Sequence, residues 1–138
     1  MYKELDDFIT GCQNTVDYWY DDGCIIASDI LAKFTEKDWE DLSSHVLTKP
    51  LLWQQKLAYC MDSSCNEHEL NILLSLLNTE DEELFVICVD TLRSYTTRDG
   101  KQMIRDNPAI VERVNELLPT AGVATKRVLE DFLEKIHG

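Results

Sequence analysis

Residues 79–95 read TEDEELFVICVDTLRSY and carry the clearest helix signature in the chain. Thr79 and Glu82 have the spacing of a capping box, with Thr79 as N-cap and Glu82 at the third helical position. Behind this cap, apolar residues recur at steps of three and four, as on one face of an amphipathic helix. Acidic side chains precede that face and Arg93 follows it, which suits the helix dipole. We therefore predict a helix across this stretch, with its apolar face formed by Leu84, Ile87, Cys88, Thr91, Leu92 and Tyr95.

The rest of the chain gives the same kind of signal. Thr35 and Asn66 are candidate N-caps, and Pro50 and Pro108 can each stand in the first turn of a helix, where no backbone donor is needed. No window alternates apolar and polar residues with the period of two that a strand requires. The sequence thus predicts an all-α protein of about seven to eight helices. Beyond residues 79–95, we expect helices over residues 2–19, 23–33, 35–47, 50–61, 66–77, 108–118 and 121–136.

A weak repeat relates three pairs of the predicted helices. In each pair, an aliphatic residue that ends the first helix precedes two residues of the second by ten and eleven positions. The three sets are Leu47 with Leu57 and Ala58, Leu77 with Ile87 and Cys88, and Leu118 with Val128 and Leu129. Stacked helix hairpins of this kind form α-solenoids such as HEAT and armadillo (ARM) repeats. Residues 1–138 are therefore predicted to form a single domain of irregularly stacked hairpins, with an irregular helical bundle as the alternative.

The charge of the chain is strongly negative and unevenly distributed. The 138 residues include 26 acidic and 13 basic side chains, a formal net charge of −13, and 44% of them are hydrophobic. Residues 57–92 hold eight acidic side chains and no lysine or arginine. This share of hydrophobic residues is enough to form a core, whereas a disordered acidic tail has too few of them. The negative charge argues against nucleic acid as a partner and favours a cationic protein.

Two segments combine aromatic with acidic side chains, as protein-binding hot spots ringed by charge do. The first comprises Tyr18, Trp19, Tyr20, Asp21 and Asp22. The second surrounds Trp39 and comprises Glu36, Asp38, Glu40 and Asp41. We predict that these nine residues contact a partner protein. Core packing of the rings, and carboxylates that serve helix starts or solvated faces, are the alternatives.

No catalytic or metal signature stands out in the sequence. Cys60, Cys65 and His68 lie close together, but a structural zinc site needs a fourth ligand and none is suitably placed. His68 and Glu69 begin like a zincin motif, whose second histidine is missing. We expect no catalytic residue, no metal and no cofactor.

The start of the chain and its cysteines bear on location. The chain begins MYKELDD, without the basic start and apolar run of a signal peptide. No stretch of about 18 apolar residues is long enough to cross a membrane. The five cysteines cannot all pair with one another, which fits a reducing compartment. We expect a soluble, cytoplasmic protein that does not bind membranes.

Residues 39–95 resemble helical immunity proteins that are encoded beside contact-dependent or Rhs-type bacterial toxins. The likeness is carried by Trp39–Ser43, by Lys49–Met61 and by the leucine-rich run Leu73–Leu77 with its continuation to Leu92. The resemblance implies tight, one-to-one binding of a cognate toxin domain, and toxin domains of this kind are often basic. It assigns no site residue, because such families share no invariant functional motif.

The functional prediction combines this resemblance with the charge of the chain. We expect an immunity protein that binds and neutralises a cognate basic toxin domain through an acidic surface with aromatic anchors. A HEAT-like adaptor or scaffold for an endogenous protein is the alternative. A small helical enzyme is a third possibility, since nucleophilic dyads meet only in the folded chain.

Overall fold

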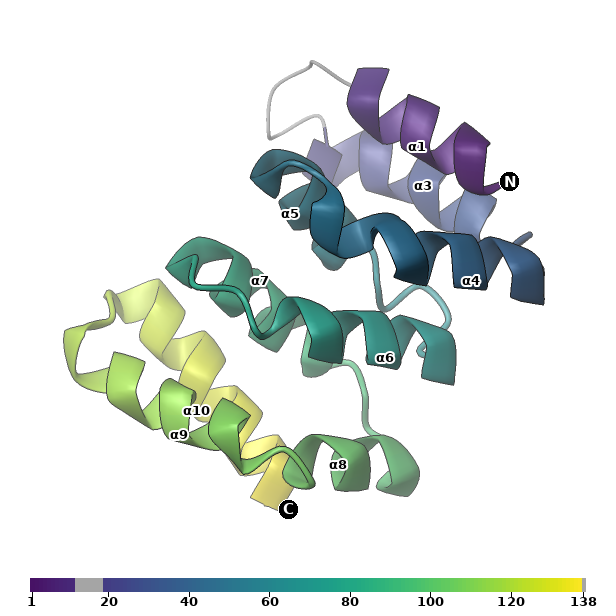
Figure 1. Ribbon diagram of the computed structural model, residues 1–138. Coiled ribbons are helices and arrows are strands. Elements are labelled where there is room, and N and C mark those ends of the chain that lie inside the picture. The colour runs from purple at the N-terminus through teal and green to yellow at the C-terminus, as the bar shows by residue number, and fades with distance from the viewer. Residues whose placement is uncertain (12–18, 138) are drawn as a thin grey trace.

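The computed structural model describes residues 1–11 and 19–137, with the backbone alone for Tyr20 and Asp21. All regular structure in these residues is helical, which confirms the all-α prediction (Figure 1). The nine α-helices are α1 (Tyr2–Gly11), α3 (Cys24–Leu31), α4 (Glu36–His45), α5 (Leu51–Tyr59), α6 (Glu67–Leu76), α7 (Glu82–Leu92), α8 (Arg98–Arg105), α9 (Pro108–Leu117) and α10 (Val123–His137). Three short helical turns accompany them, namely η1 (Trp19–Gly23), η2 (Val46–Thr48) and η3 (Leu118–Thr120).

The N-caps predicted at Thr35 and Asn66 are confirmed. The Oγ1 atom of Thr35 accepts the amide of Asp38 at 3.3 Å, and the Asp38 carboxylate accepts the amide of Thr35 at 2.9 Å. Asn66 and Glu69 form the same reciprocal pair, with 2.8 Å from the Glu69 amide to Oδ1 of Asn66. Each pair satisfies backbone donors that the first turn of a helix leaves without a partner.

The cap predicted at Thr79 is wrong by two residues. Asp81 is the N-cap of α7, and its Oδ2 atom accepts the amide of Leu84 at 2.8 Å. The hydroxyl of Thr79 instead accepts the amide of Asp81 at 3.1 Å and so closes the preceding turn. Because Thr79 is used in that turn, the carboxylate of Asp81 is left to cap the helix, a role for which aspartate is well suited.

Helix α8 was not predicted from the sequence. Its eight residues, RDGKQMIR, are mostly polar, and Gly100 and Ile104 are the two that it buries. So short a polar segment, with a glycine inside it, shows neither a wide apolar face nor a strong helix propensity. The hydroxyl of Thr97 caps it by accepting the amide of Gly100 at 3.1 Å.

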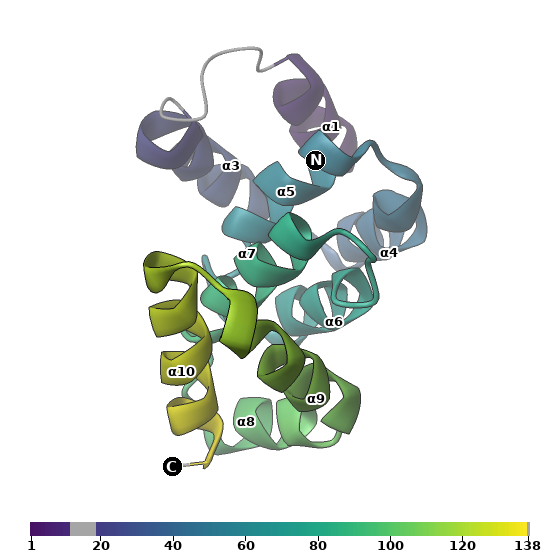
Figure 2. The same cartoon turned by 90° about the vertical axis from the view of Figure 1, so that its left-hand side faces the viewer.

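The helices form hairpins that stack in two layers, as the first of the two predicted arrangements requires. Helices α1, α4, α6 and α9 make the first layer, which faces the viewer in Figure 1, and α3, α5, α7 and α10 make the second. Within the second layer, α7 packs against α5 on one side and against α10 on the other. Figure 2 shows α3 and α10 reaching further to the left than α5 and α7. The outer face of the second layer is therefore concave.

Helix α7 contributes much of the core between the layers. Leu84, Phe85, Cys88, Val89 and Leu92 are buried, so the amphipathic pattern of residues 79–95 marks the helix at the centre of the stack. The ring of Tyr95 is buried as well, and its hydroxyl donates to the carbonyl of Met61. No helix among the described residues is long and apolar enough to span a bilayer.

Candidate functional site

The aromatic segment predicted to bind a partner divides between the core and its surroundings. Trp19 is 2% exposed, its indole N–H donates to the carbonyl of Lys56 at 3.0 Å, and its ring lies against Phe8. A tryptophan whose one polar atom is satisfied inside the protein packs as a core residue. This placement corrects the assignment of Trp19 as an exposed anchor.

The remaining residues of that segment are less fully described. Asp22 is exposed, as a partner contact requires. Tyr18 and the side chains of Tyr20 and Asp21 lie outside the described residues. The turn itself needs a glycine, since a Cβ atom at Gly23 would stand 2.7 Å from Cε3 of Trp19. Asp22 is therefore the member of this segment for which the structure gives an accessible side chain.

The second predicted segment lies on α4, and its residues have different roles. Asp38 is engaged by its own helix and by the start of the chain: it accepts the amides of Thr35 and of Tyr2, the latter at 3.3 Å. The hydrogen bond from the Thr35 amide, foremost among these contacts, holds the pKa of Asp38 below its usual value. Asp38 is thus a cap and a tether, and it is poorly placed to contact a partner.

The other carboxylates of α4 face solvent. Glu36 and Glu40 are exposed, with Glu36 within 3.1 Å of His68 Nε2, and the half-buried Asp41 pairs with Lys37 one turn away. We call Glu36, Glu40 and Asp41 the α4 acidic surface. Trp39 is buried beneath it, between the edge of Phe34 and the stacked ring of His68. An acidic surface is therefore present, but its tryptophan belongs to the core.

The structure does not bring the two predicted segments together. Turn η1 immediately precedes α3 and helix α4 follows it, so that the eight residues of α3 separate them by about 12 Å along its axis. Trp19 lies against α5, whereas Trp39 lies against the start of α6. The described residues of the two segments therefore do not form a single patch.

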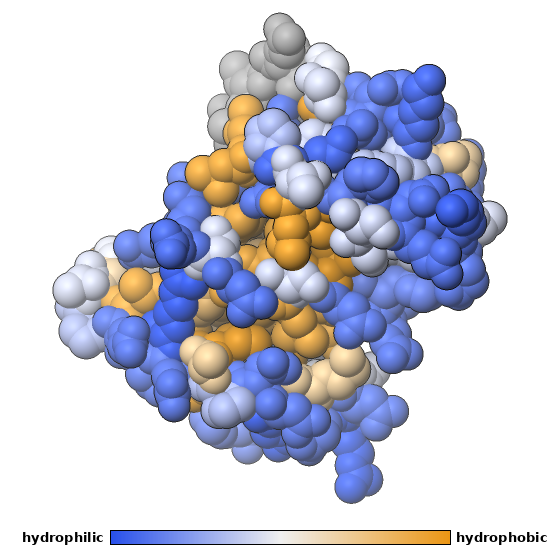
Figure 3. Space-filling view, in the orientation of Figure 1, coloured by the Kyte–Doolittle hydropathy of each residue, from blue (hydrophilic) through white to orange (hydrophobic). Residues whose placement is uncertain are grey.

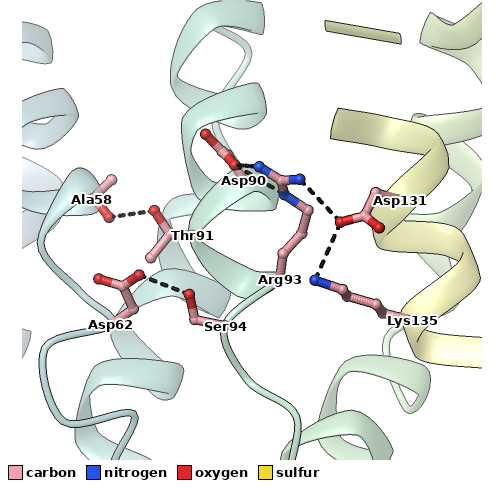
Figure 4. A network of polar contacts seen from close by, with 8 residues as sticks. All are labelled: Ala58, Asp62, Asp90, Thr91, Arg93, Ser94, Asp131 and Lys135. Atoms are coloured by element: carbon pink, nitrogen blue, oxygen red, sulfur yellow. Dashed lines mark hydrogen bonds and ion pairs between the residues drawn. The ribbon is translucent and has the colours of Figure 1, made fainter. Parts of the chain in front are cut away.

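A hollow on the concave face of the second layer was not predicted. Its volume is about 540 Å³, and its walls come from α3, from α7, from α10 and from the residues that end and follow α5. We call it the concave cleft. The side chains that give it its chemistry are Cys24, Cys60, Asp62, Asp90, Arg93 and Lys135. Figure 4 shows its charged residues at close range.

One wall of the concave cleft is an ion-pair network that joins α7 to α10. Arg93 donates from Nε to Asp90 at 3.0 Å and from Nη1 to Asp131 at 3.0 Å, and Lys135 reaches Asp131 at 3.3 Å (Figure 4). Burial lowers the pKa of Arg93, but the bonds to both carboxylates outweigh it and raise that pKa. The hydrogen bond from Arg93 in turn lowers the pKa of Asp131. Arg93 and Asp131 are therefore charged across the physiological range.

The opposite wall joins α5 to α7 through neutral and acidic groups. The hydroxyl of Thr91 donates to the carbonyl of Ala58 at 2.9 Å, and the hydroxyl of Ser94 donates to Asp62 at 2.8 Å (Figure 4). Asp62 belongs to the loop between α5 and α6. Glu69, which is fully buried, holds this loop by accepting the hydroxyl of Ser63 at 2.7 Å and the amide of Ser64 at 2.9 Å.

Cys60, a cysteine of the concave cleft, is a poor nucleophile. Burial, aided by the nearby acidic groups, raises the pKa of the Cys60 thiol well above its usual value. A thiol held protonated at neutral pH reacts slowly, because the thiolate is the reactive form. Among the described residues, no three His, Cys, Asp or Glu side chains are grouped so that they could hold a metal ion. What the cleft offers is ion pairing and hydrogen bonding.

Apolar side chains gather on the opposite face of the molecule, in the middle of the first layer (Figure 3). A smaller hollow of about 230 Å³ lies there between α6, α7 and α9, with Leu74, Leu77 and Ile110 in its walls. The guanidinium of Arg113 stacks over the ring of Phe85 at 4.4 Å and donates to the carbonyl of Thr79, so it covers part of the apolar floor. The two faces thus differ in chemistry, one apolar and the other charged.

The sequence holds only a weak signal for the charged residues of the concave cleft. Asp90 and Arg93 stand three positions apart, and Asp131 and Lys135 four, so each pair shares a helix face. Such pairs are common on any solvated helix, and nothing local indicates that Arg93 would reach Asp131. Comparison with protein-family models, with curated proteins and with solved structures found no match to this chain.

Proposed function

We propose that this protein is a helical binding module that captures one copy of a basic protein domain and neutralises it. The observation that carries the proposal is the concave cleft, a hollow of about 540 Å³ with carboxylates in its walls, on a chain with a net charge of −13. A concave surface assembled from successive hairpins is the usual binding face of stacked helical repeats.

The charge supports the proposal through the rate of association. A strongly acidic protein attracts a basic partner over long range, and walls of low dielectric constant concentrate the field inside a cleft. Steered association of this kind is fast at low salt and slows as salt is raised. The exposed carboxylates of the α4 acidic surface would add to the long-range attraction, and the cleft would supply the short-range contacts.

The resemblance of residues 39–95 to immunity proteins makes a bacterial toxin domain the proposed partner. An immunity protein must bind tightly and one-to-one, which a rigid, concave surface favours because little order is lost on binding. An adaptor for an endogenous basic protein would use the same surface. The two functions differ in whether binding inhibits the partner.

A capture experiment followed by a protection assay tests the proposal. The tagged chain is used to isolate partners from the native organism at low salt, and the bound protein is released by a salt step and identified by mass spectrometry. We expect a basic domain in a one-to-one complex. The domain is then expressed in a host with and without this chain.

The assay has three informative outcomes. Growth arrest by the domain alone, relieved by co-expression of this chain, supports neutralisation of a toxin. A basic partner whose activity is unchanged in the complex refutes neutralisation and supports an adaptor. A partner that is acidic, or whose binding ignores salt, contradicts the proposed electrostatic capture altogether.

A further inference from the structure

We infer that the concave face binds a helical segment of the basic partner along the groove between α7 and α10, with a cationic side chain at Asp62 and Asp90 and an apolar side chain at Val86 and Ile87. This inference rests on the proposed function and specifies its binding surface. It requires that the groove continue beyond the concave cleft, that its charge be unbalanced and that its length suit a helix.

A second hollow continues the groove toward the start of α7. Its volume is about 370 Å³, and Glu82, Glu83, Val86, Ile87 and Thr125 line it. Val86 and Ile87 are half-buried, so an apolar floor lies between exposed carboxylates. This end of the groove can accept an apolar side chain that has basic neighbours.

The two hollows lie along one line. Glu83, Val86, Asp90 and Arg93 follow one another at steps of three and four, so they share one face of α7. Helix α10 borders both hollows, with Thr125 at one and Lys135 at the other. Ten residues of helix separate these two positions, which corresponds to about 15 Å. Within this groove, the apolar anchor at Val86 and the acidic anchor at Asp90 lie four residues apart on α7, which is about one helical turn.

The charges along the groove do not balance. The two basic residues that line the groove already form ion pairs within the protein: Arg93 pairs with Asp90 and Asp131, and Lys135 pairs with Asp131. Among the described residues, no ion pair involves Glu82, Glu83 or Asp62. Asp62 accepts the Ser94 hydroxyl and can still accept a charged donor at its other oxygen. The surplus of carboxylates selects a lysine or arginine side chain, with arginine better suited to reach Asp62 and Asp90 together.

The spacing of the anchors selects a helical segment. An amphipathic helix that carries an apolar residue and an arginine four positions apart presents both on one side, because four residues make about one turn. Such a helix can lie in the shallow groove between α7 and α10 with its basic residues toward Glu82 and Glu83. Apolar contact at one end and ion pairing at the other would then fix its direction.

A pair of synthetic peptides tests the inference. The first is a helical peptide of about 15 residues with leucine and arginine four positions apart, and the second has the same composition with the two residues adjacent. Binding to the full chain is followed by the chemical shifts of its backbone amides in ¹⁵N-labelled protein. We expect the first peptide to shift the amides of Val86 and Asp90 and to bind at least about fivefold more tightly than the second.

Variants with matched changes in charge locate the interaction. Asp62→Asn together with Asp90→Asn should weaken binding of the first peptide at least about fivefold. Glu36→Gln together with Glu40→Gln removes the same charge from the α4 acidic surface and should change it less than about twofold. If the double cleft variant is unstable, Asp62→Asn alone serves, because it leaves the contacts of Arg93 intact. Equal binding of the two peptides, an equal loss in both double variants or no shift at all would overturn the inference.

The same variants separate the inference from the proposed function. If the natural basic partner still binds the wild-type chain and the cleft variant equally well, the protein remains a binding module and the groove is not its site. If the partner is lost from the cleft variant and retained by the α4 variant, both proposals are supported. If the wild-type chain captures no basic domain, the proposed function itself is refuted.

Discussion

The α4 acidic surface and the concave cleft hold similar numbers of carboxylates in different settings. Glu36, Glu40 and Asp41 project from one helix into solvent, where their partners are a lysine one turn away and a histidine of the next hairpin. The carboxylates of the cleft come from different elements, and two of them, Asp90 and Asp131, share Arg93 across the junction of α7 with α10. The first group lies on the surface of a single helix, whereas the second forms contacts between helices.

This difference shows that acidity alone does not define a binding site. Exposed charges on a convex surface are screened by water and salt, and their pairs contribute little to stability. Charges in a concave wall interact through a medium that excludes part of the water, so each has a stronger effect on its neighbours and on an incoming ligand. If this interpretation is correct, equal changes in charge should have unequal effects in the two regions.

The largest effect is expected where a buried carboxylate supports the rim of the concave cleft. In Glu69→Gln, the carboxylate oxygen that accepts the amide of Ser64, in the loop that carries Asp62, becomes an amide nitrogen. Two donors then face each other. We expect the free energy of unfolding to fall by about 2 kcal/mol, since hydrogen bonds to a buried charged group are among the stronger ones. Urea denaturation measures it. The control is Glu67→Gln, an exposed residue in the same helical turn, which should change stability by less than about 0.5 kcal/mol.

A smaller effect is expected at the junction of α7 with α10. Arg93→Met keeps much of the side chain's packing but leaves Asp90 and Asp131 without this cation, and the side chain is 30% exposed. We expect a loss of about 1 kcal/mol, the upper end for partly exposed pairs. A double-mutant cycle with Asp131→Asn isolates the pair. A coupling energy indistinguishable from zero would show that the network does not hold α10 in place.

Acid should weaken the same junction gradually. The pKa of Asp131 is lowered in the folded protein, so its contribution to stability is complete above the usual value of 3.8 and is lost as pH falls through the lower, folded value. Asp38, whose pKa is also lowered, adds a similar slope from α4. Stability of the wild-type chain should therefore decline below about pH 4, and Asp131→Asn should decline less steeply. Identical slopes in thermal melts of the two proteins would contradict this expectation.

The smallest effect is expected on the α4 acidic surface. Glu36→Gln with Glu40→Gln removes two exposed carboxylates whose contacts are weak, and the free energy of unfolding should change by less than about 0.5 kcal/mol. Association with a basic partner should slow slightly at low salt and be unchanged at high salt. Stopped-flow mixing at two salt concentrations measures this. A large loss of affinity at high salt would place the partner on α4 and reverse the roles of the two regions.

Much of the helical architecture could be predicted because its signals are local. The caps at Thr35 and Asn66 act within one helical turn, and the apolar face of residues 79–95 repeats with the period of a single helix. The same locality explains the errors. Asp81 and Thr79 are both good caps two residues apart, and α8 has too few apolar residues to show a period.

The starts of most helices and their apolar faces can thus be predicted from the amino-acid sequence because they depend on residues within a few positions, and the acidity follows from the composition. The burial of Trp19 and Trp39 is visible only in the folded chain, and so is the cleft lined by Asp62, Asp90, Arg93 and Lys135. Those four residues span more than half of the chain. They meet because four hairpins stack so that α3 and α10 project beyond α5 and α7 (Figure 2). The packing of several apolar faces at once sets that arrangement.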